Sequence, residues 1–126
     1  MQRQIIIMTC DTQLRNALSR ICLGQGCRVE TAVSIASAQE MASRIPVCLT
    51  VADISVQNVG KAMELAEAIH ERNPDARCFL IVDGESSDTL SSAENESWLC
   101  FVHKPIRMLH FLSDVVDAIT TSRVGE

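Results

Sequence analysis

Apolar residues along the chain form two alternating patterns, short unbroken runs and stripes with helical spacing. The runs are too short for helices and rich in β-branched residues, which is typical of strands buried on both faces. They fall at residues 5–8, 27–33, 47–52, 78–82 and 98–106, and the second of them is the weakest. The sequence therefore predicts five strands.

Between these runs, apolar residues recur at steps of three and four, the spacing of an amphipathic helix. Gly24 and Gly26 end the first stripe, Ser34 offers an N-cap to the second and Pro46 stops it. Strands that alternate with helices predict an α/β domain, a doubly wound parallel sheet with helices on both faces. The stripes consist of Leu14, Ala17, Leu18 and Ile21, then Ile35, Ala38, Ala42 and Ile45, then Ala62, Leu65, Ala66 and Ile69, and last Met108, Leu112, Val115 and Ile119.

The acidic stretch of residues 83–97 breaks this alternation. It has no basic residue, and only Leu90 and Ala93 could anchor a helix on the core. Such a helix would be short and weakly held. We expect this stretch to be the most mobile connection of the chain.

Composition and charge limit the classes of function. With 126 residues, 47% of them apolar, residues 1–126 fit one domain with a core of its own. No apolar run approaches the ~20 residues of a membrane span, and no signal peptide precedes the first strand, so we expect a cytoplasmic protein with no membrane partner. A net charge of −5 without a basic cluster argues against direct binding of nucleic acid.

The six cysteines show no C-x2-C spacing, which argues against a zinc site or a redox dithiol. Cys10, Cys48, Cys78 and Cys100 fall inside or at the ends of apolar runs, so we expect buried free thiols, which suit a reducing compartment. His70, His103 and His110 have no ligand spacing either.

Two charged residues stand at the ends of predicted strands. Asp53 follows the third run, and Lys104 ends the fifth because Pro105 cannot continue a hydrogen-bonded ladder. In an open parallel sheet the ligand crevice lies outside these strand ends. Each residue also has a plain interpretation, the lysine as a solvated side chain and the aspartate as a loop or cap residue.

Taken with the topology, three sequence features resemble the receiver domains of two-component response regulators. They are Asp53 at the end of the third strand, the Asn73-Pro74-Asp75 turn, and Phe-Val-His-Lys-Pro-Ile at residues 101–106. The resemblance covers about residues 4–121. It implies a flavodoxin-like sheet with the strand order 2-1-3-4-5.

The resemblance also implies roles for individual residues. Asp53 is the candidate phosphoacceptor, which takes a phosphoryl group from the phosphohistidine of a histidine kinase or phosphotransfer protein. Lys104 pairs with the phosphate, the peptide bond before Pro105 is cis, and Phe101 is the aromatic switch residue. Output goes to a downstream effector protein or domain, through a face spanning about residues 87–118.

The metal site is where the sequence departs most from receiver domains. Their acidic pair, which holds magnesium, falls on Thr9 and Cys10, and the nearest carboxylate is Asp11. Magnesium prefers an octahedron of oxygen ligands, commonly one or two carboxylates with phosphate and water. We therefore expect at most a weak magnesium site at Asp11 and Asp53.

Two further positions depart from the pattern. Val82 stands where receivers have a small hydroxyl residue, and a methyl group cannot donate a hydrogen bond to a phosphoryl oxygen. The glycine that follows the phosphoacceptor loop falls on Ala62, and the register within residues 54–61 stays open. The lost acidic pair and Val82 lead us to expect an impaired phosphorylation site.

These departures leave three interpretations of the function. Opposite charges about 4 Å apart attract by roughly 4 kcal/mol at a protein-surface dielectric, so Lys104 could hold Asp53 without metal. The domain is then either a slow phosphoacceptor or a phosphorylation-independent adaptor, and in neither case an enzyme. The third interpretation is a phosphotransfer enzyme built on Cys10, beside a helix N-terminus where thiols ionise more readily, but a C-x5-R loop is missing by one residue.

Overall fold

The computed structural model describes residues 3–82 and 97–121, and its centre is a parallel sheet of five strands. The order β2-β1-β3-β4-β5 confirms the doubly wound topology. The strands are β1 (Gln4–Met8), β2 (Arg28–Ala32), β3 (Val47–Asp53), β4 (Arg77–Val82) and β5 (Leu99–His103).

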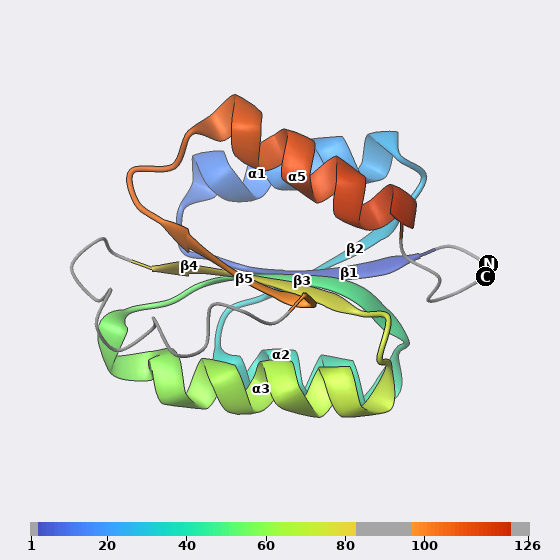
Figure 1. Ribbon diagram of the computed structural model, residues 1–126, viewed down its shortest axis with the longest axis vertical. Coiled ribbons are helices and arrows are strands. Elements are labelled where there is room, and N and C mark those ends of the chain that lie inside the picture. Colours follow the sequence, from blue (N-terminus) through green and yellow to red (C-terminus); the bar gives the residue numbers. More distant parts are fainter. Residues whose placement is uncertain (1–2, 83–96, 122–126) are drawn as a thin grey trace.

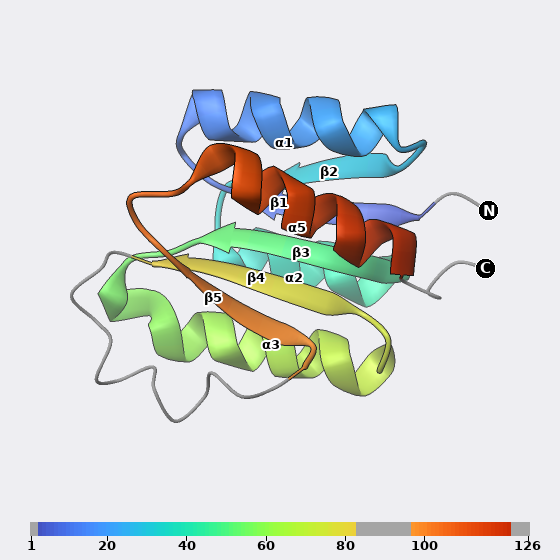
Figure 2. The ribbon, with the colours of Figure 1, turned by 45° about the horizontal axis from the view of Figure 1, so that its top comes forward.

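Helices cover both faces of this sheet. Figure 1 shows α1 and α5 on one face of it and α2 and α3 on the other. Figure 2 shows β2 and β5 at opposite edges of the sheet. The predicted three layers are therefore present. The helices are α1 (Thr12–Gly24), α2 (Ile35–Arg44), α3 (Val59–Arg72) and α5 (Met108–Thr121), with a short 3-10 helix η1 (Val56–Asn58) before α3.

Two apolar cores lie on the two faces of the sheet. In β1, Ile5 and Ile7 pack on the α1/α5 side while Ile6 packs on the α2/α3 side, and all three are fully buried. Successive side chains of a strand point to opposite faces, so a strand covered on both sides has apolar residues at every position. This explains the unbroken apolar runs in the sequence.

The predicted helix ends are confirmed at two places. The Ser34 hydroxyl oxygen accepts a hydrogen bond of 3.1 Å from the backbone N–H of Ser37, which satisfies a free donor in the first turn of α2. At the end of α1, Gly26 has a φ of 79°, a conformation in which glycine lacks the Cβ penalty of other residues.

The prediction that β5 is buried on both faces is wrong. Of its five residues only Leu99 is buried, because β5 lies at the edge of the sheet, and the Cys100 thiol is exposed. Cys10 is exposed as well, so the expectation of buried thiols fails at both positions and holds at Cys48 and Cys78. In α5 the buried stripe contains Phe111, while the predicted Met108 is 37% exposed.

The acidic stretch lies outside the described residues except for Ser97, and the expectation of a weakly held helix there stays a prediction. Within residues 3–82 and 97–121, no helix has the length and apolarity that crossing a membrane requires.

Candidate functional site

Asp53 and Lys104, the two charged residues predicted at strand ends, are in contact. The Lys104 ammonium Nζ lies 3.0 Å from Asp53 Oδ1, and the Thr9 hydroxyl donates a hydrogen bond of 2.9 Å to Asp53 Oδ2. The aspartate side chain is only 12% exposed, against 40% for the lysine. Both oxygens of this nearly buried carboxylate therefore have a partner.

The register of the strands brings these three side chains together. Met8 pairs with Ala52 across β1 and β3, so Thr9 and Asp53 follow as neighbours. The end of β4 positions Lys104, whose backbone N–H donates a hydrogen bond of 2.9 Å to the carbonyl oxygen of Val82. The Lys104–Pro105 peptide bond is cis, as predicted.

Asp11, the carboxylate predicted to replace the missing metal ligands, caps α1. Its Oδ1 accepts hydrogen bonds from the backbone N–H groups of Gln13 at 3.0 Å and Leu14 at 3.2 Å. Its own N–H donates to the Thr9 hydroxyl oxygen at 3.0 Å. An aspartate three residues before the first apolar residue of a helical stripe is a signal for an N-cap, and that signal was available in the sequence.

The described residues fit a magnesium ion poorly. Nowhere in residues 3–82 and 97–121 do three or more His, Cys, Asp or Glu side chains gather as metal ligands would. The Asp53 carboxylate is engaged by Thr9 and Lys104, and one oxygen of Asp11 serves the helix cap. Weak magnesium binding by Asp11 and Asp53 stays a prediction.

The predicted switch positions differ in burial. Val82 is fully buried at the end of β4, with only methyl groups to present to the site. Phe101 is half-buried on the edge strand and packs against the core on the α2/α3 side. The roles of Val82 and Phe101 in a switch stay predictions. Ala62, where the glycine of receivers falls, is fully buried in α3.

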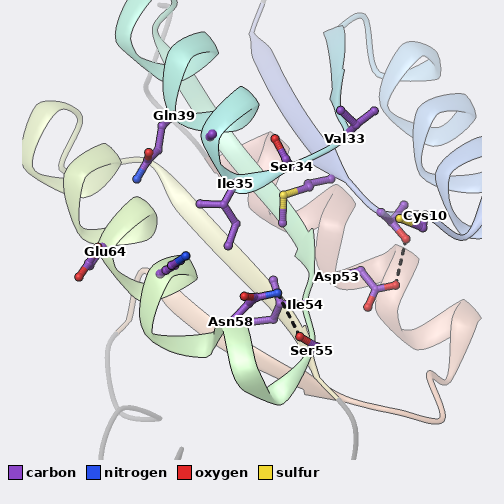
Figure 3. A pocket seen from close by; sticks show the side chains of 14 residues that line it. Cys10, Val33, Ser34, Ile35, Gln39, Asp53, Ile54, Ser55, Asn58 and Glu64 are labelled. Atoms are coloured by element: carbon purple, nitrogen blue, oxygen red, sulfur yellow. Dashed lines mark hydrogen bonds between the residues drawn. The ribbon is translucent and has the colours of Figure 1, made fainter.

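Cys10 lies beside Asp53 on the wall of a cavity of about 650 Å³ (Figure 3). The described residues that line this cavity include no arginine and no glycine, so no cradle for a phosphate surrounds the thiol. By contrast, burial raises the pKa of the Cys22 and Cys78 thiols to about 12. Those two thiols therefore stay protonated at neutral pH.

Away from the site, the chain's one tryptophan has an aromatic partner that the sequence did not predict. The rings of His70 in α3 and Trp98 before β5 stack with centroids 4.2 Å apart and planes at 7°. This contact ties the start of β5 to the end of α3.

No family model and no curated protein matches the sequence. Solved structures do match it, and in each of three examples the match covers 95% of this chain. A CheY-like response regulator receiver domain protein from Methanospirillum hungatei has 17% identity, a TM-score of 0.71 and 95% of its own chain covered. A two-component transcriptional regulator AraC from Clostridium phytofermentans has 18% identity, a TM-score of 0.76 and 95% of its own chain covered.

The third structure, an adenylate cyclase from Rhodopirellula baltica, has 20% identity, a TM-score of 0.74 and 89% of its chain covered. Identities this low carry the fold and not the activity. Together with the sheet order and the strand-end position of Asp53, they show that this chain has the fold of response regulator receiver domains.

Proposed function

We propose that this chain is a receiver-like domain of a two-component phosphorelay that acts through protein contacts. Its input partner is a histidine kinase or phosphotransfer protein, and its output partner is a downstream effector protein or domain. Asp53 is the candidate phosphoacceptor, and Thr9 and Cys10 take the place of the metal-binding acids. The fold and the contact between Asp53 and Lys104 support this assignment.

One observation carries the proposal that phosphorylation is slow: the Lys104 ammonium engages one Asp53 oxygen and the Thr9 hydroxyl engages the other. Phosphoryl transfer is catalysed mainly by positioning and by neutralising charge on the transferred group. Lys104 supplies one positive charge at the carboxylate, and it already neutralises Asp53. A phosphodonor must compete with this ion pair and with the Thr9 hydroxyl, so the reaction is slow.

The same observation supports a second candidate function, a phosphorylation-independent adaptor. In that case the Lys104 ammonium holds the loop after β5 permanently, and the domain presents one surface to its partner. A phosphotransfer enzyme built on Cys10 is not favoured, because the described residues around this thiol's cavity include no arginine.

Labelling with acetyl phosphate in the presence of magnesium tests the proposal. We expect intact-mass spectrometry to show a small, slowly growing phosphorylated fraction of the wild-type chain and none in Asp53→Asn. Rapid, near-complete labelling would contradict the impaired site. Label on Cys10 would support the enzyme instead, and no label with unchanged partner binding by Asp53→Asn would identify the adaptor.

A further inference from the structure

A cavity lined in part by Asp53 lies at the carboxyl edge of the sheet. It measures about 650 Å³ and opens outside the carboxyl ends of β1 and β3, between the N-terminal ends of α2 and α3 (Figure 3). These two strands flank the point where the strand order reverses, which is where open α/β sheets bind ligands. The volume falls within the usual range of small-molecule sites, roughly 300–1,000 Å³.

One wall of this cavity is aliphatic. Met8 at the end of β1, Ile35 at the start of α2 and Ile54 after β3 contribute apolar side chains, and Val33 at the rim is 86% exposed. No aromatic ring is among the described lining residues, so the cavity has no surface on which a planar base could stack. This wall suits branched aliphatic groups.

Three charged side chains line the cavity, those of Asp53, Lys61 and Glu64. Lys104 neutralises Asp53 at one end of the cavity. Lys61 and Glu64 also line it, one turn apart on α3, and neither makes an ion pair within the described chain. Figure 3 shows Glu64 and Gln39 at the end opposite Cys10 and Asp53. As far as the described residues go, a cation and an anion are thus available to one ligand.

We propose that this cavity binds a short zwitterionic peptide of aliphatic residues, about the size of a dipeptide. Its carboxylate pairs with Lys61, its ammonium pairs with Glu64, and its side chains pack on Ile35 and Ile54. A net-neutral ligand with separated charges pairs with both side chains, whereas an anion would be repelled by Glu64. The site goes beyond the proposed function, since it requires no phosphorylation.

Titration with valyl-valine, followed by amide NMR shifts, tests this site in the wild-type protein. We expect saturable shifts at Ile35 and Ile54 with a dissociation constant on the order of 1 mM, because exposed ion pairs contribute little. N-acetyl-valyl-valine lacks the ammonium and valyl-valine amide lacks the carboxylate. Each should bind about threefold more weakly.

Two variants test the same charges from the protein side. Lys61→Met and Glu64→Gln should each weaken valyl-valine binding about threefold, whereas Glu67→Gln, an exposed acid of α3 outside the cavity, should not. Unsaturable shifts, equal binding of the blocked peptides, or tighter binding of inorganic phosphate or a nucleotide would overturn the proposal. Acetyl phosphate labelling of Asp53 has no bearing on these outcomes, so the two proposals fail separately.

Discussion

Lys104 and Asp53 form an ion pair across the end of β4, with 3.0 Å between Nζ and Oδ1. Asp53 ends β3 and Lys104 follows β5, while the last residues of β4 accept backbone hydrogen bonds from both loops, at Ile81 from Ile54 and at Val82 from Lys104. The ion pair therefore joins two loops that the β4 backbone already aligns. Its loss should affect stability unequally, depending on which partner is removed.

Lys104→Met should destabilise the fold by about 1 to 2 kcal/mol, because it leaves a nearly buried carboxylate with only the Thr9 hydroxyl as partner. Asp53→Asn should cost less than about 1 kcal/mol, since the lysine side chain is 40% exposed and water can solvate it. Urea unfolding at pH 7 measures both free energies. Equal costs, or a larger cost for Asp53→Asn, would contradict this account of the pair.

Asp11→Ala should destabilise the chain by about 1 kcal/mol, the usual cost of removing an N-cap side chain. Thermal unfolding with EDTA present measures it without any contribution from metal. Asp75→Ala, at an exposed acid with no described hydrogen bond, is the matched control and should leave the melting temperature nearly unchanged. If the loss for Asp11→Ala appeared only with magnesium present, Asp11 would act as a metal ligand and not as a cap.

Stability should fall at alkaline pH because of the buried thiols. Burial raises the pKa of Cys22 and Cys78 from 9.0 to about 12, so above pH 9 the unfolded chain releases protons that the folded chain keeps. The free energy of unfolding then decreases as pH rises from about 9 toward 12, by at most about 1.4 kcal/mol per pH unit for each thiol.

Urea midpoints between pH 8 and pH 10.5 measure this decline. Cys22→Ala and Cys78→Ala should each flatten it, whatever they cost at pH 7, whereas Cys10→Ala, at an exposed thiol, should keep the wild-type slope. Equal slopes for all four proteins would show that these thiols do not control alkaline unfolding.

The sheet and its helices could be predicted because both faces of the sheet are covered, which leaves a strong periodic signal. The failure at β5 has the opposite cause. An edge strand such as residues 99–103 can be apolar although it has a neighbouring strand on one edge only. The composition of the run does not reveal that it lies at the edge. The pattern of apolar residues predicts where strands lie, whereas the order of the strands in the sheet determines how deeply each one is buried.

The site was predictable as far as strand ends determine it. Asp53 and Lys104 were expected to meet because parallel strands end at the same edge of the sheet. The part played by Thr9 was missed: it was counted as a lost metal ligand, yet its hydroxyl donates to Asp53 and accepts from Asp11. The cavity was missed because it depends on the path of residues 54–61, whose register the sequence leaves open.

The most direct prediction on the phosphorylation site is its repair. Thr9→Asp with Cys10→Asp places two carboxylates beside Asp53, and repulsion between like charges should lower the melting temperature in EDTA. Magnesium should raise it again, since a ligand that binds only the folded state stabilises it in proportion to the logarithm of its concentration. Acetyl phosphate should then label Asp53 faster than in the wild-type chain.

The control for this repair is the triple variant that adds Asp53→Asn, which should keep part of the magnesium response and lose all labelling. The wild-type chain should show little change of melting temperature with magnesium, because Thr9 and Lys104 already engage Asp53. Strong stabilisation of the wild type by magnesium would mean that Asp11 reaches the metal despite its role as a cap. In that case the replacement of the acidic pair would not impair the site, and the domain would be a working phosphoacceptor.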